Sequence, residues 1–449
     1  MHHDITNMLS LSPTPNRDGA LSMDTAMRVI KFPSRDAKFD LYERYLRWVL
    51  LTHSQKGNPD FDVRGEPKSY VDGRIFDGPW GRNQNDGPAL RASVLIDYAN
   101  ELIAEGKTEY VLSKIYNPDP SVKSGIKYDL EYVANNWHEK TFEPWEEVNG
   151  NHFFVAMVQR KALIKGSELA KTLKDYDASV FFGAQAAAIN VYLDSFYEPC
   201  INNITPSKNY GDSKVAKDKD DMDISTVLGA LYGGMEGQSF DAYDERILAS
   251  LINIEGWFQN EYPINWRDDK VVPGILFGRY PRDVYDGTGV SIGNPWILTT
   301  AAASEIYYLN AHKLKALADA NASLTISSRA KTFYVASTHY MPDSAAMYKF
   351  LGQLSELADQ TCNRTTLVTQ LKAGLSDTIT INGDVLQNIA SALYIKADGF
   401  NERLNHHTPP DDSLAEQIDR ELGNHRGAQH LTWSYANVLS AMHARGDKL

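Results

Sequence analysis

The sequence has two cysteines and no long apolar run, and both shortages narrow the classes of protein it can encode. Charged or polar residues interrupt every apolar run before the roughly 18 residues that a membrane-spanning helix needs, so we expect no membrane partner. The first residues include neither a basic segment nor an apolar core, and no signal peptide is visible. Cys200 and Cys362 could pair in an oxidising compartment or remain as buried thiols.

Positive charge is scarce as well. The chain has 45 Lys and Arg against 58 Asp and Glu, a net charge of -13, and nucleic acids are bound by clustered cations. We therefore expect no nucleic-acid partner. With 43% hydrophobic residues among 449, the chain has enough apolar material for a sizeable core, as a globular protein requires.

The motifs of several cofactor-dependent and nucleophilic enzymes are missing. Gly287, Gly289 and Gly293 follow no strand and do not have the dinucleotide-binding spacing. No His, Cys or Glu spacing suits zinc, and we interpret His406 and His407 as a pair of loop residues. No serine lies in a nucleophile-elbow motif. We expect neither a metal nor an organic cofactor.

Apolar residues recur at helical spacing along most of the chain. The pattern predicts helices over 39–53, 88–104, 128–137, 152–173, 179–196, 243–261, 295–318, 344–361 and 428–443, and one short strand over 378–381. Three long loops, over 65–87, 268–294 and 400–427, are rich in Trp, Tyr, Arg and Asp, which is typical of functional loops. The charged stretch 217–223 is interpreted as a solvated loop. We predict one all-α domain over residues 1–449.

Two acidic stretches far apart in the chain each have aromatic neighbours. Glu146 and Glu147 follow Trp145, and Glu416 precedes Trp433 by a short loop. Cleavage of a glycosidic bond needs two carboxyl groups, because one donates a proton to the leaving oxygen and the other activates water or attacks the anomeric carbon. An alternative is that Glu146 and Glu147 only favour the dipole of a following helix.

Two further motifs have simple explanations as well as functional ones. Asp86-Gly87-Pro88 would suit the start of any helix, although this does not explain Trp80 and Arg82 in the loop before it. Arg279 and Asp283 could form an ordinary surface ion pair.

Four segments together resemble the fungal and yeast glucoamylases (glucan 1,4-alpha-glucosidases, glycoside hydrolase family 15), which release glucose from the ends of starch and glycogen. These segments are Trp80-Gly81-Arg82 with Gln84 and Asp86-Gly87-Pro88-Ala89-Leu90, Trp145-Glu146-Glu147, Gly278-Arg279-Tyr280-Pro281, and Leu431-Thr432-Trp433-Ser434. They occur in the family's order, and the resemblance extends from about Asn16 to the C-terminus.

The resemblance implies an (α/α)6 barrel with its site among the loops at one end, and cleavage with inversion. Glu146 matches the general acid and Glu416 the general base, and an inverting pair stands roughly 6.5–9.5 Å apart. The implied substrate-binding residues are Arg17, Asp18, Trp80, Trp145, Glu147, Arg279, Tyr285, Trp296 and Trp433. The tryptophans outside the motifs, Trp48, Trp137, Trp257 and Trp266, are interpreted as structural.

The sequence departs from the family most strongly at its start. The family has a helix before the Arg17-Asp18 pair, and we expect this first helix of the barrel to be missing. Leu11 replaces a tyrosine near the reaction centre, and Pro15 replaces a tryptophan. A truncated or variant start and a diverged member both remain open, and we expect reduced activity rather than none. Arg282 replaces a glutamate, a charge reversal expected to alter a loop contact.

We therefore predict an inverting, exo-acting hydrolase that releases β-D-glucose from the non-reducing ends of α-1,4-glucans and cleaves α-1,6 links more slowly. One alternative is a carbohydrate-binding relative with weak or no turnover, and another is a different (α/α)6 glycosidase such as a trehalase-like enzyme. No starch-binding domain is visible. The resemblance implies a secreted or vacuolar protein, and we expect a monomer.

Overall fold

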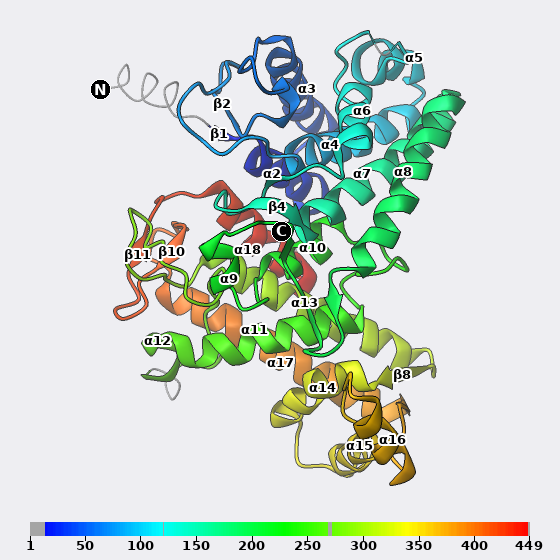
Figure 1. Cartoon of the computed structure of the whole chain (residues 1–449), viewed down its shortest axis with the longest axis vertical. Coiled ribbons are helices and arrows are strands. Elements are labelled where there is room, and N and C mark those ends of the chain that lie inside the picture. The colour runs from blue at the N-terminus through cyan, green and yellow to red at the C-terminus, as the bar shows by residue number, and fades with distance from the viewer. Residues whose placement is uncertain (1–13, 120, 268–271, 448–449) are drawn as a thin grey trace. The chain divides into compact units, whose positions relative to one another are not determined.

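The computed structural model describes residues 14–119, 121–267 and 272–447. Contacts divide the chain into two compact units. Unit 1 comprises residues 1–194 and 207–216, and unit 2 comprises residues 195–206 and 217–449. Helices dominate both units and the strands are short (Figure 1). The predicted all-α class is confirmed.

Unit 1 is built around a long central helix. Its helices are α2 (Asn16–Val29), α3 (Arg35–Ser54), α4 (Asp86–Ala104), α5 (Thr108–Tyr110), α6 (Lys127–Asn136), α7 (Phe153–Thr172) and α8 (Tyr176–Asp194), with a 3-10 turn over Val63–Gly65 and a π-helical turn over Val111–Tyr116. α4 is buried along most of its length and packs against α2, α6 and α7. Because α4 is fixed on several sides, the loop that precedes it is held firmly.

A charged cluster anchors α4 inside unit 1. Arg91 of α4 donates hydrogen bonds to both carboxylate oxygens of Asp129, at 3.0 and 2.8 Å, and His53 lies 3.1 Å from the same carboxylate. All three side chains are buried. Removing one partner would leave an uncompensated buried charge, so the cluster fixes α3, α4 and α6 in register with one another.

Short strands in unit 1 hold its functional loops. β1 (Thr14–Pro15) pairs antiparallel with β2 (Lys68–Ser69). β3 (Thr141–Phe142) and β4 (Asn149–His152) form a hairpin in which Thr141 faces Gly150, and β4 also pairs with β7 (Ser207–Lys208). The hairpin presents residues 143–148, which include two of the predicted site carboxylates, as its connecting loop.

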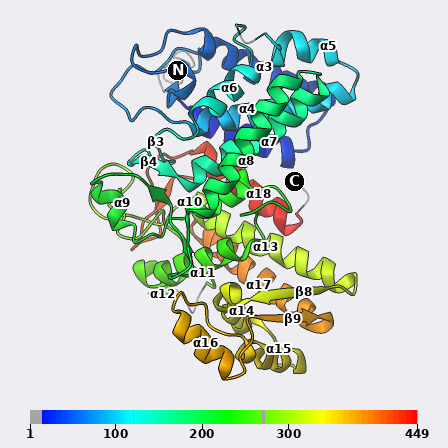
Figure 2. The ribbon, with the colours of Figure 1, turned by 45° about the vertical axis from the view of Figure 1, so that its right-hand side comes forward.

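In unit 2, α10, α17 and α18 pack on α13, and α14 and α15 pack on α17 (Figures 1 and 2). Its helices are α10 (Ser225–Gly233), α11 (Glu245–Glu261), α12 (Pro263–Arg267), α13 (Ile297–Asp319), α14 (Lys331–Ser337), α15 (Ala345–Glu356), α16 (Arg364–Lys372), α17 (Gly383–His407) and α18 (Thr432–Arg445), and α9 (Lys214–Asp218) crosses the boundary between the units. The 3-10 turns are Ser328–Ala330 and Thr338–Tyr340.

The strands of unit 2 form three two-stranded ribbons. β5 (Tyr197–Glu198) pairs with β6 (Asn203–Ile204), β8 (Ser323–Ser327) with β9 (Thr378–Asn382), and β10 (Gln417–Ile418) with β11 (His425–Arg426), all antiparallel. The strand predicted over 378–381 is therefore confirmed. Ile379 and Ile381 are buried while Thr378 and Thr380 are exposed, the alternation of a half-buried strand.

All nine predicted helices are present, but several others were missed. The longest miss is α17, which packs against α13 and occupies the first part of the loop predicted over 400–427. His406 and His407 are consequently the last residues of a helix rather than loop residues. The first half of α17 does have helical apolar spacing, since Val385, Leu386, Ile389 and Leu393 recur on one face and are buried, so this helix could have been predicted from the sequence.

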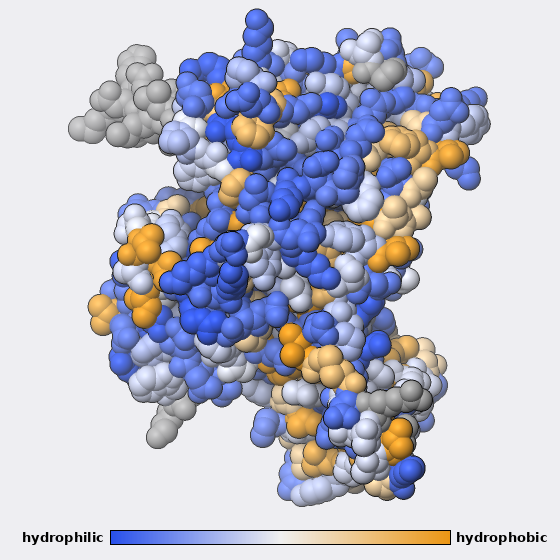
Figure 3. Space-filling model, viewed as in Figure 1, coloured by the Kyte–Doolittle hydropathy of each residue, from blue (hydrophilic) through white to orange (hydrophobic). Residues whose placement is uncertain are grey.

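One outer helix and the two cysteines lie at the surface. Val180 and Val191 of α8 are more than 70% exposed, and apolar side chains are visible along α8 in Figure 3. Cys200 and Cys362 are exposed free thiols, so their interpretation as buried residues was wrong. Among the helices of the described ranges, none combines the length and the apolar character needed to cross a lipid bilayer.

Candidate active site

The hairpin loop of unit 1 holds Glu146 in an unusual backbone conformation. Glu143 is buried, and its carboxylate accepts hydrogen bonds from the backbone N–H groups of Trp145 at 3.0 Å and Val148 at 3.0 Å. The N–H of Glu146 donates to the carbonyl oxygen of Glu143 at 2.9 Å. Glu146 adopts φ +68°, a left-handed conformation that side chains other than glycine rarely adopt and that functional sites often contain.

The Glu146 side chain lies among polar groups from three segments of unit 1. Gln84 Nε2 donates to Glu146 Oε1 at 2.8 Å. Arg17 Nη2 is 3.5 Å from the same oxygen, and Lys68 Nζ is 3.9 Å from Oε2. The Glu146 side chain keeps 17% exposure, so a ligand can still reach it. Glu146 does not begin a helix, since α7 starts only at Phe153, and the helix-dipole interpretation is wrong.

Arg17 and Asp18 are both buried in the first turn of α2. Arg17 Nη1 donates to Asp86 Oδ2 at 2.9 Å and to Gln84 Oε1 at 3.3 Å. Burial alone would lower the pKa of Arg17, but the carboxylates of Asp86, Glu146 and Asp18 outweigh it and raise the pKa above its usual value. Arg17 therefore carries a positive charge at acidic and neutral pH.

Asp18 has a different electrostatic environment. Burial raises the pKa of Asp18 to about 7, and Arg17 opposes this shift only in part. At mildly acidic pH the carboxyl group is mostly neutral, so it can both donate and accept a hydrogen bond. The Arg17-Asp18 pair thus offers a fixed cation beside a neutral hydroxyl-like donor, a combination suited to sugar hydroxyl groups.

The aromatic residues predicted for unit 1 have different exposures. Trp80 is 41% exposed, and Lys68 Nζ lies 3.3 Å from the centroid of its ring. Trp145 is buried and Glu147 is partly buried. Trp80 can therefore stack on a ligand directly. Trp145 is instead buried within the 143–148 loop and supports its conformation.

The base candidate of unit 2, Glu416, lies directly before β10. Tyr285 donates from its hydroxyl group to Glu416 Oε2 at 3.2 Å. Burial raises the pKa of Glu416, while hydrogen bonds from Tyr285 and from the backbone of Ala428 oppose the rise. A carboxylate with a raised pKa is a stronger base than an exposed one, which suits the activation of water.

Gly427 approaches this carboxylate closely. It has φ +72°, and a Cβ atom at this position would lie 2.2 Å from Glu416 Oε2. Only glycine combines the left-handed backbone with the missing side chain that this approach requires. The β10–β11 ribbon thus determines where the Glu416 carboxylate can lie.

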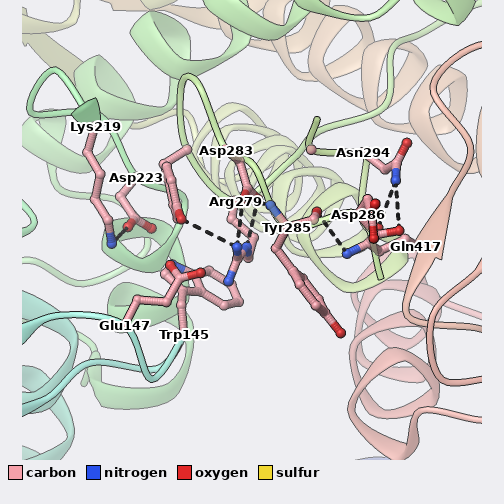
Figure 4. Close-up of polar contacts among 12 residues, drawn as sticks. Trp145, Glu147, Lys219, Asp223, Arg279, Asp283, Tyr285, Asp286, Asn294 and Gln417 are labelled. Atoms are coloured by element: carbon pink, nitrogen blue, oxygen red, sulfur yellow. Dashed lines mark hydrogen bonds and ion pairs between the residues drawn. The ribbon is translucent and has the colours of Figure 1, made fainter. Parts of the chain in front are cut away.

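Arg279 and Asp283 form a buried pair, so the interpretation as a surface ion pair was wrong. Arg279 Nε donates to Asp283 Oδ2 at 2.7 Å and Arg279 Nη2 to Oδ1 at 2.6 Å, as Figure 4 shows. The guanidinium carbon lies 5.2–5.3 Å from the ring centroids of Tyr285 and Trp296. This fork geometry orients the charge of Arg279 toward the aromatic residues beside Glu416.

The stretch 217–223 was predicted as a solvated loop, which holds for the exposed Lys217, Asp220 and Asp221 but was wrong for Lys219 and Asp223. Lys219 and Asp223 are buried and form an ion pair of 2.8 Å, which Figure 4 also shows. Lys219 Nζ lies 4.4 Å from the ring centroid of Tyr280, the neighbour of Arg279. At the surface nearby, Arg282 forms an ion pair with Asp220 at 2.6 Å. The positive charge that replaces the family's glutamate at this position is thus paired with a carboxylate.

The two remaining aromatic residues of unit 2 are buried in its wall. Trp296 lies 6.1 Å from Tyr285 between ring centroids. Trp433 Nε1 donates to the hydroxyl group of Tyr232 at 3.3 Å. Both indoles are at most 5% exposed, so they shape the wall around Glu416 more than they contact solvent.

Sequence reasoning did not assign a role to several polar residues of the two candidate regions. In unit 1, Lys68 and Gln84 contact Glu146, and Asp86 accepts from Arg17. In unit 2, Asp283 accepts from Arg279, and Gln417 accepts from Asn294. Gln84 and Asp86 belong to a motif that was recognised, and Gln417 follows Glu416 directly. Lys68 carries no local signal, because only the pairing of β1 with β2 brings it near Glu146.

Comparison with known proteins places the chain in a family. Residues 17–443 match the model of the glycosyl hydrolases family 15. A glucoamylase of Blastobotrys adeninivorans is 34% identical over 440 residues, covering 96% of this chain and 64% of that protein. Glucoamylase 1 of Rhizopus oryzae is 33% identical over 387 residues, covering 85% and 56%. The chain thus spans less than two thirds of both relatives.

A solved structure gives the same result for the fold. The structure of a glucoamylase from Saccharomycopsis fibuligera superposes with a TM-score of 0.77 at 29% identity, covering 97% of this chain and 86% of that one. The chain belongs to the glycosyl hydrolases family 15, and its (α/α)6 fold class is as predicted. The altered residue Pro15 lies in β1, whereas Leu11 lies outside the described residues.

Proposed function

We propose that this protein is an exo-acting glucan 1,4-alpha-glucosidase, a hydrolase that releases β-D-glucose from the non-reducing ends of α-1,4-glucans. The observation that carries the proposal is that a carboxyl group occupies both positions that match the family's catalytic residues, and that hydrogen bonds hold each of them in place. Glu146 lies on a turn that Glu143 holds, and Glu416 accepts from Tyr285. The named relatives are glucoamylases, which favours this activity over a trehalase-like one.

In the proposed reaction Glu146 donates a proton to the oxygen of the scissile bond while Glu416 removes a proton from the attacking water. Water then adds to the face of the anomeric carbon opposite the leaving group, so the configuration inverts. The two carboxyl groups and a water molecule suffice, and the reaction needs no metal or organic cofactor. The predicted separation of the carboxyl groups, roughly 6.5–9.5 Å, is part of this proposal.

Arg17 and Asp18 are proposed to bind the terminal sugar ring. The Arg17 guanidinium is fixed by Asp86, and Asp18 carries a proton at mildly acidic pH. Together they can donate to and accept from neighbouring hydroxyl groups of one ring. Because these residues would recognise the terminal ring of a glucan chain and not an internal ring, the enzyme would act from the chain end. Starch, dextrins and glycogen are the proposed substrates, with α-1,6 links cleaved more slowly.

The proposed domain organisation, oligomeric state and localisation follow from the resemblance to the family. We propose that residues 1–449 act as one catalytic domain, because the family model matches residues in both units. A monomeric, secreted or vacuolar protein is the proposal that the family resemblance supports.

Leaving-group chemistry tests the roles of the two carboxyl groups. A p-nitrophenolate group leaves without protonation, whereas a sugar alkoxide needs a proton. Glu146→Gln should lower kcat on maltoheptaose by about 100- to 10,000-fold and affect p-nitrophenyl α-glucoside far less. Glu416→Gln should lower kcat on both substrates by similar factors.

Matched controls for these variants are Glu139→Gln in unit 1 and Glu402→Gln in unit 2, since both carboxylates are exposed. Both controls should keep the wild-type rates. If Glu146→Gln lost activity equally on the two substrates, Glu146 would not be the general acid. If the folded wild type bound maltoheptaose without releasing glucose, the enzyme proposal would be wrong and the carbohydrate-binding alternative would stand.

A further inference from the structure

Unit 2 contains a cavity that shares no residue with the surroundings of Glu416. It has a volume of about 670 Å³ and opens between α11, α12, α17, the Thr338–Tyr340 turn and the loop 272–275. These helices can be located in Figure 1. The volume is in the range of pockets that bind small organic ligands.

The floor of the cavity is a buried ion pair. Lys396 Nζ lies 2.6 Å from Glu255 Oε1, and the Tyr307 hydroxyl group donates to Glu255 Oε2 at 2.5 Å. Lys396 is 2% exposed. Since both carboxylate oxygens of Glu255 are occupied and the two charges cancel, the floor favours a neutral polar ligand over an ion.

The rim combines aromatic surface with side-chain hydrogen-bonding groups. Trp266 on α12 is 51% exposed and therefore lies outside the buried core. Tyr340 lines the cavity and is partly exposed. His339, Gln259 and Asn260 are exposed on the same rim. Amides and an imidazole around an indole can bind a ligand that has an apolar face and hydroxyl groups at its edge.

The rim is held firmly by a buried arginine. Arg403 of α17 donates to the backbone carbonyl oxygens of Ile264 at 3.3 Å, Val272 at 2.5 Å and Gly274 at 3.1 Å. These contacts fix the ends of the segments that carry Trp266 and the loop 272–275. A preformed rim binds with a smaller loss of conformational freedom than a mobile one.

We propose that this cavity binds a segment of an α-glucan chain and holds the polymer without cleaving it. A glucose ring has the required apolar face and ring of hydroxyl groups. Among the described residues of its lining, Glu255 is the single carboxylate, and its pairing with Lys396 prevents it from acting as acid or base. The ligand class rests on the proposed function, since α-glucan is the substrate of that activity.

The test compares glycogen binding with hydrolysis of a small substrate in the full chain. Trp266→Ala and Gln259→Ala should each weaken retardation in glycogen-containing gels, the former by about 10-fold in apparent affinity. Both should hydrolyse maltose at the wild-type kcat/KM, since neither residue belongs to the active site. Tyr348→Ala is the matched control, because Tyr348 is an aromatic residue of unit 2 outside the cavity and is 61% exposed, against 51% for Trp266.

The outcomes separate this proposal from the proposed function. Glycogen affinity unchanged in both cavity variants, with maltose hydrolysis intact, would overturn the cavity proposal alone. Equal losses in the Tyr348→Ala control would also overturn it, because the effect would not be specific to the cavity. If the wild type released no glucose but Trp266→Ala still weakened glycogen binding, the cavity proposal would stand and the enzyme proposal would be wrong.

Discussion

Replacing Gly427 by alanine should separate the placement of the base from the stability of the fold. The new Cβ would lie 2.2 Å from Glu416 Oε2, closer than the 3.0 Å that such contacts respect. The carboxylate must therefore move by about 1 Å, and a misplacement of that size lowers a rate by about 100-fold. The left-handed φ of +72° adds about 1–2 kcal/mol of backbone strain.

The assay is kcat/KM on maltoheptaose together with the thermal unfolding midpoint. Gly427→Ala should lose about 100-fold in kcat/KM while remaining folded. Gly289→Ala is the control, since a Cβ there meets nothing within 4 Å and its backbone is not left-handed. If Gly427→Ala were folded and as active as Gly289→Ala, the position of Glu416 described above would not be the one used in catalysis.

Three further substitutions test individual groups. Tyr285→Phe removes a hydrogen bond that lowers the pKa of Glu416, so the acidic limb of the kcat/KM profile should move to higher pH, and an unmoved limb would contradict the contact. Asp18 holds its proton to about pH 7 when folded but only to about 3.8 when unfolded, so the wild type should lose up to about 4 kcal/mol of stability as pH rises from 4 to 8. Asp18→Asn should lack this loss, and parallel pH–stability curves would refute the assignment. Glu143→Gln weakens the hydrogen bonds that hold the Glu146 turn, and should cost about 1–3 kcal/mol of stability and lower kcat more than it raises KM. Unchanged unfolding and kcat would show that the turn does not depend on Glu143.

The sequence predicted most of the long helices, such as α4, α7 and α13, because their apolar residues recur over many turns. It missed α17, although Val385, Leu386 and Ile389 recur there at helical spacing directly after a strand. It also missed the burial of Lys219 and Asp223, which neutralise each other as a pair. Such burial depends on which charges meet in the fold, and no local pattern reports it. For the same reason, the sequence could not distinguish a buried Arg279–Asp283 pair from a pair at the surface.

The candidate site was predictable where its residues lie in recognisable motifs. Glu146, Arg279 and Glu416 belong to such motifs, and the structure adds what holds each of them. Lys68 and Gly427 were not predictable, because they contact Glu146 and Glu416 through strand pairing and a left-handed turn. The exposure of Trp266 was not predictable, because the exposure of a tryptophan on a five-residue helix depends on tertiary packing.

The measurement that tests the central claim most directly is the anomeric configuration of the first glucose released from maltoheptaose, followed by NMR at about pH 5. An inverting reaction through Glu146 and Glu416 forms β-glucose first, with the α anomer appearing only as mutarotation proceeds. The signal should disappear in Glu416→Gln. If α-glucose formed first, or if Glu416→Gln released β-glucose at the wild-type rate, the proposed acid–base pair would be wrong.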